Sequence, residues 1–140
     1  MDYWTFLRLP NSLKTYEICL EAVRKSGSSL YYVPEQHKTY ELCLEAVKND
    51  GYALRDVPGK YKDLNLCLIA FKNDPDTLQW IPYKHRTYEL CLKAVKCSGW
   101  NLQFVPEQYK DSIMCLTALQ NNGNAIEYVP EQFKNLIEGL

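Results

Sequence analysis

Apolar and polar residues follow one another along the chain in a pattern that returns every 24 residues. Residues 14–34 read KTYEICLEAVRKSGSSLYYVP, and residues 38–58 read KTYELCLEAVKNDGYALRDVP. The prolines keep the same interval, at Pro10, Pro34, Pro58, Pro82, Pro106 and Pro130. Five cysteines also keep it, at Cys19, Cys43, Cys67, Cys91 and Cys115. A fixed period of this length indicates a stacked array of structural repeats.

The first half of each repeat predicts an amphipathic α-helix. After Thr15, apolar residues cover one broad arc of a helix, while Glu17 and Glu21 fall on the remaining face. Thr15 is a good N-cap, and we expect Gly27 to close the helix in the left-handed conformation. The equivalents of Thr15 are all capping types: Thr39, Asp63, Thr87, Asp111 and Asn135. The pattern therefore predicts helices at about residues 16–26, 40–50, 64–74, 88–98 and 112–122.

The second half of each repeat predicts a shorter element. Leu30 and Val33 form an apolar pair at i and i+3, which suits one or two helical turns, and the pair recurs in the other copies. A strand such as LYYV is the alternative, but period-2 alternation is absent. We expect a short helical or 3₁₀ segment at about residues 28–33. Pro34 then starts a further turn.

These elements predict an all-α fold, a short-repeat α-solenoid in which each 24-residue unit has one α-helix and one short helical or 3₁₀ segment. The complete units are 15–38, 39–62, 63–86, 87–110 and 111–134, flanked by partial repeats at 1–14 and 135–140. One unit of this size cannot enclose a core alone, so neighbouring units must share their apolar faces. We expect residues 1–140 to form a single repeat domain.

The repeat motif resembles that of a known family. The pattern G-x-A-L-x-x-V-P-E-x-x-K-T-x-E-L-C-L-x-A-V stands here as GYALRDVPGKYKDLNLCLIAF at residues 51–71 and GWNLQFVPEQYKDSIMCLTAL at residues 99–119. It is similar to bacterial tandem repeats that are catalogued only as a domain of unknown function. The resemblance implies a helical repeat array and a bacterial or phage origin, and it implies no activity.

Composition and charge narrow the function classes only a little. The chain has 16 basic and 17 acidic side chains and a net charge of -1, so it has no overall field that would attract a polyanion or a membrane surface. The N-terminal residues MDYWTFLRLPNSLK show neither a secretory signal nor a spanning helix. We expect a cytoplasmic protein without membrane association.

The residues that could carry chemistry are explained by the repeat. Equivalent cysteines in packed helices are about 8–10 Å apart, whereas a disulfide needs Cα atoms within about 7 Å. We expect these cysteines to be small buried apolar residues that bind no metal. His37 and His85 occupy a slot that elsewhere holds Leu13, Tyr61, Tyr109 and Phe133, so a ring-sized packing role is favoured over catalysis or metal binding. We expect no catalytic residue, no metal and no cofactor, and hence a protein that is not an enzyme.

A basic residue precedes every predicted N-cap. These residues are Lys14, Lys38, Lys62, Arg86, Lys110 and Lys134, which we call the basic column. A cation at this place opposes the positive end of the helix dipole, so helix stability does not require it. The column could pair with carboxylates or lay its aliphatic stems over the proline turns. The alternative is a ladder that contacts the phosphates of a nucleic acid, which the net acidity disfavours.

Differences between the copies mark candidate recognition slots. Three slots vary on the second segment: Ser28, Tyr52, Asp76, Trp100 and Asn124; Tyr31, Arg55, Gln79, Gln103 and Glu127; and Tyr32, Asp56, Trp80, Phe104 and Tyr128. Tyr, Trp and Arg dominate the energetics of protein interfaces. The predicted protein-binding residues are Tyr32, Tyr52, Arg55, Trp80, Trp100, Phe104 and Tyr128, with Ile69 and Ile113 as apolar departures on the helices. The alternative is that the aromatic residues are partly buried between turns.

The function predicted from these observations is a non-enzymatic protein–protein interaction module whose partner is another protein. One alternative is a small phage-borne, anti-CRISPR-like inhibitor of a nucleic-acid-processing enzyme. A second is direct RNA or DNA binding through the basic column. Cys97, which lies outside the cysteine lattice, should be exposed. Leu136, Ile137 and Leu140 are apolar residues in the last partial repeat, and they suggest end-to-end self-association.

Overall fold

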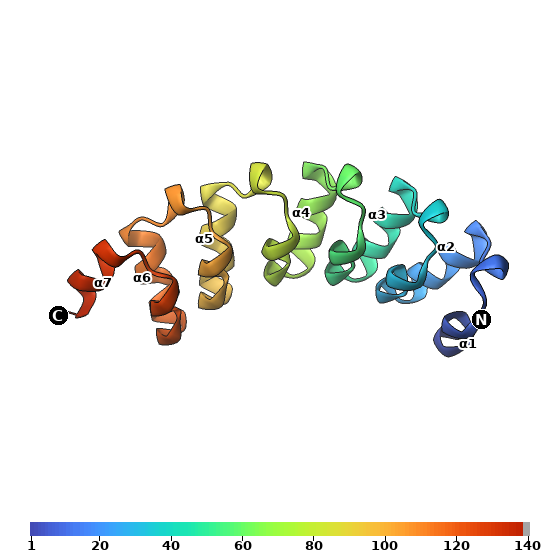
Figure 1. Cartoon of the computed structure of the whole chain (residues 1–140), viewed down its shortest axis with the longest axis horizontal. Helices are drawn as coiled ribbons and strands as arrows, with labels where there is room; N and C mark the ends of the chain where they lie inside the picture. The colour runs from blue at the N-terminus through green and yellow to red at the C-terminus, as the bar shows by residue number, and fades with distance from the viewer. Residues whose placement is uncertain (139–140) are drawn as a thin grey trace. The chain divides into compact units, whose positions relative to one another are not determined.

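A computed structural model of the chain describes residues 1–138 and consists of α-helices and 3₁₀-helices, with no strand in these residues. Figure 1 shows the α-helices α1 (Tyr3–Arg8), α2 (Tyr16–Lys25), α3 (Tyr40–Asn49), α4 (Leu64–Asn73), α5 (Tyr88–Cys97), α6 (Ser112–Asn121) and α7 (Glu131–Glu138). Five long 3₁₀-helices follow α2 to α6: η2 (Gly27–Tyr32), η4 (Gly51–Asp56), η6 (Pro75–Trp80), η8 (Gly99–Phe104) and η10 (Gly123–Tyr128). Short ones follow the prolines: η1 (Asn11–Leu13), η3 (Glu35–His37), η5 (Gly59–Tyr61), η7 (Tyr83–His85) and η9 (Glu107–Tyr109). The predicted all-α repeat fold is confirmed.

The chain forms two compact units, Met1–Trp80 and the part that begins at Ile81. In the first unit α3 packs against both α2 and α4, and η4 packs against both η2 and η6. In the second unit α5 packs against α6, and η8 packs against η10. Inside each unit, therefore, α-helix lies beside α-helix and long 3₁₀-helix beside long 3₁₀-helix.

Side-chain caps begin helices α2 to α6 as the sequence predicts. Thr15 Oγ1 accepts a hydrogen bond from the Ile18 N–H at 3.3 Å, and Asp63 Oδ1 accepts one from the Leu66 N–H at 2.8 Å. The same cap is made by Thr39, Thr87 and Asp111. The prediction for Asn135 is wrong, because this residue lies inside α7. The Lys134 N–H bonds to the Pro130 carbonyl at 3.1 Å, so an α-helix replaces the short 3₁₀ turn of the other repeats.

The repeat glycines have a role that differs from the predicted one. No glycine among the described residues has a positive φ, so Gly27 does not end α2 in a left-handed conformation. A Cβ on Gly51 would instead lie 2.7 Å from the Ala70 carbonyl oxygen in the next helix. The same carbonyl contact, made by the following helix, would block a Cβ on Gly27 or Gly99. At these three positions glycine is therefore required by the close approach of one repeat to the next.

The core is formed by equivalent positions of successive repeats. Leu30, Leu54, Leu78 and Leu102 of the long 3₁₀-helices are fully buried, as are the five lattice cysteines. These cysteines, Cys19, Cys43, Cys67, Cys91 and Cys115, are free thiols, and we call them the buried cysteines. Burial raises the pKa of the last four from 9.0 to about 11. The prediction that they serve as small apolar residues is confirmed.

Candidate functional site

The predicted aromatic residues lie on the long 3₁₀-helices. Because these helices pack side by side within a unit, their variable slots are brought together on η2, η4 and η6 in the first unit and on η8 and η10 in the second. In η2, η4, η6 and η8 the leucine of the repeat is fully buried, while the neighbouring variable slots are less buried. The local reason is the 3₁₀ geometry, in which residues at i and i+3 share a face and the residues between them point elsewhere.

Several of the aromatic side chains are open to solvent. Tyr31 is 62% exposed, Trp100 is 43% exposed and Tyr52 is 42% exposed. Tyr32 is also exposed, whereas Trp80, Phe104 and Tyr128 are half-buried. The sequence left open whether the aromatic residues are exposed or partly buried between turns. In the structure some of them are exposed and others are half-buried.

Aromatic rings from neighbouring repeats contact one another in each unit. The rings of Tyr52 and Trp80 are 5.3 Å apart in an edge-to-face arrangement, and those of Trp100 and Tyr128 are 5.8 Å apart. Such pairs contribute about 0.5–1.5 kcal/mol beyond the area that they bury. The pairs therefore restrain Tyr52 and Trp100, which leaves their exposed faces in defined positions.

Ile69 and Ile113 are not part of this aromatic surface. They lie on α4 and α6, and Ile113 is exposed while Ile69 is half-buried. Ile69 lines an open depression with Lys48, Lys72 and Asn73. The structure thus places the two apolar departures on the α-helices and apart from the variable slots.

An open depression of about 370 Å³ lies at the 3₁₀ surface of the first unit. Its lining residues are Tyr3, Ser28, Tyr31, Tyr32 and Arg55, and we call it the tyrosine depression. The Arg55 side chain is 60% exposed, and its Nη2 lies 3.5 Å from Asp56 Oδ2. Sequence reasoning missed Tyr3, which precedes the first complete repeat. Tyr3 lies 24 residues before Gly27, so an aromatic residue stands where the next copy of the repeat has glycine. This difference between the copies could have identified Tyr3 from the sequence.

Four members of the basic column donate to backbone carbonyls of the protein. Lys14 Nζ donates to the carbonyl of Tyr32 at 3.1 Å, and Lys62 Nζ donates to that of Trp80 at 3.2 Å. In the second unit Arg86 Nη1 donates to the Phe104 carbonyl at 2.7 Å. Lys110 Nζ reaches the Tyr128 carbonyl at 3.3 Å. Each acceptor is the last residue of a long 3₁₀-helix 18 residues further along, so these cations join one repeat to the next within a unit.

The remaining members of the column make carboxylate pairs. Lys38 Nζ lies 2.8 Å from Glu35 Oε1, and Lys134 Nζ lies 3.5 Å from Glu131 Oε1. Lys110 makes a similar pair with Glu107 besides its carbonyl bond. Burial lowers the pKa of Lys62 and of Arg86, because desolvation disfavours their charged forms. Neither side chain is presented to solvent as a free cation would be.

His37 fills a ring-sized packing position. Its ring lies 6.4 Å from the ring of Tyr16 in an edge arrangement, and Tyr40 and Tyr61 form the corresponding pair one repeat later at 6.3 Å. The packing role predicted from the repeat is thus present at His37. Within residues 1–138 no group of three or more His, Cys, Asp or Glu side chains could hold a metal ion.

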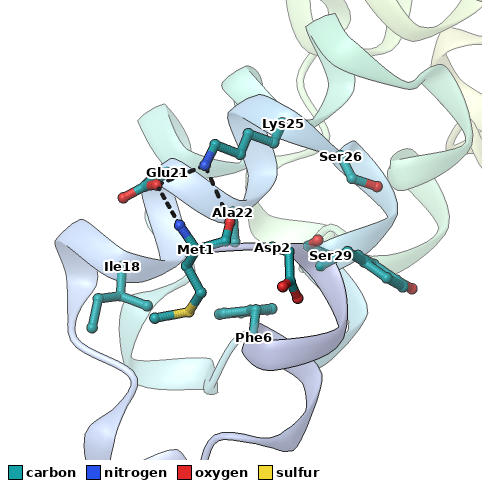
Figure 2. Close-up of a pocket in the computed structure, with 10 residues that line it drawn as sticks. Met1, Asp2, Phe6, Ile18, Glu21, Ala22, Lys25, Ser26 and Ser29 are labelled. Atoms are coloured by element: carbon teal, nitrogen blue, oxygen red, sulfur yellow. Dashed lines mark hydrogen bonds and ion pairs between the residues drawn. The ribbon is translucent and has the colours of Figure 1, made fainter.

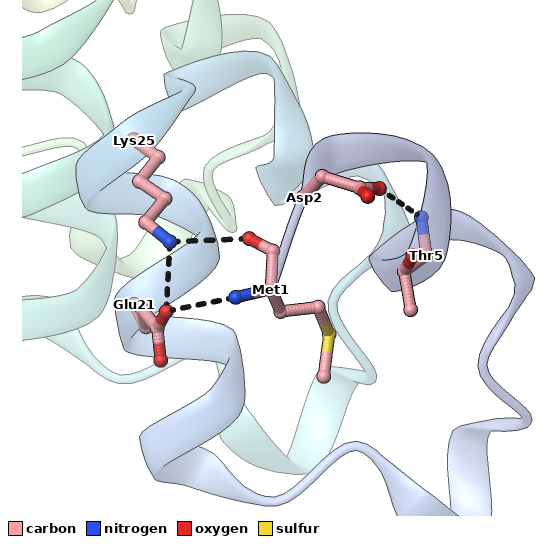
Figure 3. Close-up of polar contacts among 5 residues, drawn as sticks. All are labelled: Met1, Asp2, Thr5, Glu21 and Lys25. Carbon is pink, nitrogen blue, oxygen red and sulfur yellow. Dashed lines mark hydrogen bonds and ion pairs between the residues drawn. The ribbon is translucent and has the colours of Figure 1, made fainter.

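A small cavity lies under the N-terminal helix of the first unit (Figure 2). Figure 3 shows its polar edge, where the Met1 amino group and Lys25 Nζ approach Glu21 Oε1 at 3.4 and 2.9 Å. Lys25 Nζ also donates to the Met1 carbonyl, and both contacts of Glu21 lower its pKa, with Lys25 as the main cause. The cavity has a volume of only about 30 Å³, which leaves room for a few water molecules at most. It is too small for a ligand.

Two further predictions concern Cys97 and the last partial repeat. Cys97 is exposed at the end of α5, as predicted. Leu136 is exposed and Ile137 is half-buried, while Leu140 lies outside the described residues. Leu136 and Ile137 line an apolar groove of about 170 Å³ together with Phe133 of α7 and with Ser112, Cys115 and Leu116 of α6. Self-association through this region stays a prediction.

A family model described as "Domain of unknown function (DUF4116)" matches residues 39–86 and 87–134, which together make up more than half of the chain. Each match covers two repeats and begins at an N-cap, Thr39 or Thr87. The comparison with curated proteins gave no match, and the comparison with solved structures gave none. None of the helices in residues 1–138 has the length and apolarity that crossing a lipid bilayer requires.

Proposed function

The chain belongs to this family of unknown function, and we propose from its structure that it is a repeat module that binds another protein through its long 3₁₀-helices. One observation carries the proposal. In η2, η4, η6 and η8 the slot that holds leucine is fully buried, whereas the slots that change most carry aromatic side chains that are exposed in η2, η4 and η8. Variation that is confined to the outside of a uniform scaffold is typical of repeat proteins that bind partners.

The chemistry of the exposed side chains favours a protein partner. Tyr and Trp combine a large apolar face with a hydrogen-bonding group, and they are enriched where protein interfaces have their strongest contacts. Tyr52 and Trp100 are in addition held by ring contacts, so a partner would pay little entropy to immobilise them. These features support binding and require no catalytic group.

The basic column gives less support to nucleic-acid binding. Lys14, Lys62 and Arg86 donate to backbone carbonyls inside the repeats, and each would have to give up that bond to reach a phosphate. Leaving a buried carbonyl without its partner costs about 1–3 kcal/mol. A role in holding the scaffold explains the column without a ligand.

The test is capture of partners from the native host by the immobilised full chain, followed by affinity measurement with the purified partner. We expect Tyr52→Ala combined with Trp100→Ala to weaken binding at least about tenfold, because each removes an exposed aromatic contact. Leu13→Ala is the matched control, since Leu13 is an exposed apolar residue on a short 3₁₀-helix. The proposal is wrong if the double variant binds like the wild type while its circular dichroism and melting temperature are unchanged.

A further inference from the structure

We propose that the tyrosine depression receives an acidic segment of the partner protein, with a partner carboxylate on Arg55 and an adjoining apolar or aromatic side chain among the tyrosines. This inference rests on the proposed function and specifies the chemistry of the partner. It concerns the first unit alone.

The shape of the tyrosine depression suits a short peptide segment. Tyr31 and Tyr32 of η2 contribute most of its aromatic lining, and their rings meet edge to face at 5.0 Å. Tyr3 of α1 and Arg55 of η4 complete it, so three elements contribute. Its volume of about 370 Å³ lies at the lower end of the range of small-molecule pockets, and it is open to solvent.

The charge of the tyrosine depression determines which partner side chains it favours. Arg55 is the single charged residue among the lining residues, and the lining contains no carboxylate. The contact with Asp56 uses one terminal nitrogen at 3.5 Å, and 60% of the Arg55 side chain stays exposed. A guanidinium has five donors in a planar fork, so Arg55 can donate hydrogen bonds to a partner carboxylate while it stays near Asp56. An acidic side chain is therefore the complementary group.

The second unit carries the opposite charge at the equivalent slot. One period corresponds to 24 residues, so the slots of Ser28, Tyr31, Tyr32 and Arg55 recur in the second unit as Trp100, Gln103, Phe104 and Glu127. Glu127 is exposed, as Arg55 is. The two units share the scaffold but differ in charge and ring content at this slot. A preference for acidic segments is thus a property of the first unit.

The experiment selects random 12-residue peptides displayed on phage against the immobilised full chain. We expect the enriched peptides to carry Asp or Glu next to an aromatic or large aliphatic residue. An Arg55→Glu chain should lose this enrichment, because it would place a carboxylate where the peptide's carboxylate binds. Basic peptides, or no enriched peptide at all, would overturn the inference.

The most enriched peptide is then synthesised with a fluorescent label, and its affinity is measured by fluorescence polarisation. We expect Arg55→Gln and Tyr31→Ala each to weaken binding about tenfold, as loss of a charged hydrogen bond or an aromatic contact does. Arg24→Gln is the matched control, because Arg24 is a similarly exposed arginine on α2, and it should change the affinity less than about twofold. Equal affinities for wild type and Arg55→Gln would overturn the inference.

The outcome is separable from that of the proposed function. If the native partner binds through Tyr52 and Trp100 but is indifferent to Arg55→Glu, the acidic-segment inference fails and the proposed function stands. If the partner is indifferent to the aromatic residues as well, both fail. Circular dichroism of each variant shows whether the fold is kept, and Arg55 and Tyr31 are exposed enough that we expect no change.

Discussion

Substituting alanine for glycine in two neighbouring repeats tests how the repeats fit together. Gly99 and Gly123 both begin a long 3₁₀-helix, in η8 and η10 of the second unit. A Cβ on Gly99 would collide with the Ala118 carbonyl oxygen of α6 and lie 3.0 Å from Asn122 Cβ. A Cβ on Gly123 would meet no atom within 4 Å. The same substitution is therefore made once at a close contact and once in open space.

The expected effects have opposite signs. Gly99→Ala should lower the free energy of unfolding by about 1–3 kcal/mol, because the added methyl pushes η8 away from α6 in a tightly packed interface. The shift would also strain the hydrogen bond from the Gly99 N–H to Asn121 Oδ1, which is 2.7 Å long. Gly123→Ala should raise the free energy of unfolding by about 0.4–1 kcal/mol, because alanine reduces the conformational freedom of the unfolded chain.

The assay is urea and thermal unfolding of both variants and the wild type, followed by circular dichroism. One kcal/mol corresponds to roughly 4 °C in melting temperature for a chain of this size, so the two variants should differ by several degrees. If both substitutions destabilise the protein equally, the close-contact explanation is refuted. That result would instead favour glycine as a left-handed residue, which the absence of positive φ in the described residues contradicts.

Three further measurements address the thiols and the basic column. Four of the buried cysteines have a folded pKa of about 11 against 9.0, so the native state keeps protons that the unfolded chain loses. Stability should be intact below pH 9 and fall by roughly 2–3 kcal/mol per thiol as the pH rises to about 11, which a pH titration by circular dichroism measures. At pH 8 one thiol, Cys97, should react at once with Ellman's reagent and the buried cysteines only on unfolding; fast reaction of more than one would contradict the structure. Lys62→Met should lower the free energy of unfolding by about 1–2 kcal/mol, because the Trp80 carbonyl loses its donor, whereas exposed Lys60→Met should change it by less than about 0.5 kcal/mol in the same urea titration.

The repeat period predicted most of the fold. Helices predicted at about 16–26 and 40–50 run from Tyr16 to Lys25 and from Tyr40 to Asn49, and the predicted short segment at 28–33 is the 3₁₀-helix Gly27–Tyr32. The period worked because the same caps, apolar slots and prolines recur, and each copy supports the interpretation of the others. It failed for Asn135, where the local sequence has a capping residue but the chain has already entered α7.

The contacts between repeats were harder to predict because backbone atoms make them. A glycine that allows left-handed φ and a glycine that allows close approach look the same in the sequence, and only the position of the Ala70 carbonyl distinguishes them at Gly51. The role of Asn73 was also hard to predict from the sequence. Its Oδ1 accepts a hydrogen bond from the Gly51 N–H at 3.2 Å, and every residue except proline has such a backbone donor. The aromatic slots were visible from their variation, but their degree of burial depended on these contacts.

The sequence places a cation before each helix N-terminus, where the helix dipole disfavours it, and the structure shows where the charge of Lys14 lies instead. Beside its own helix N-terminus Lys14 would be unfavourable, but its ammonium group lies at the C-terminal carbonyl of η2, where the helix dipole is negative. The same carbonyl belongs to Tyr32, and the corresponding bonds in later repeats end at Trp80 and Phe104. The side chains of Tyr32, Trp80 and Phe104 belong to a variable slot, but the backbone carbonyl of each accepts a hydrogen bond from a Lys or Arg side chain. Every member of the basic column is a Lys or an Arg. This arrangement separates the stability of the scaffold from the identity of the aromatic side chains, so the proposed binding surface can change without loss of the fold.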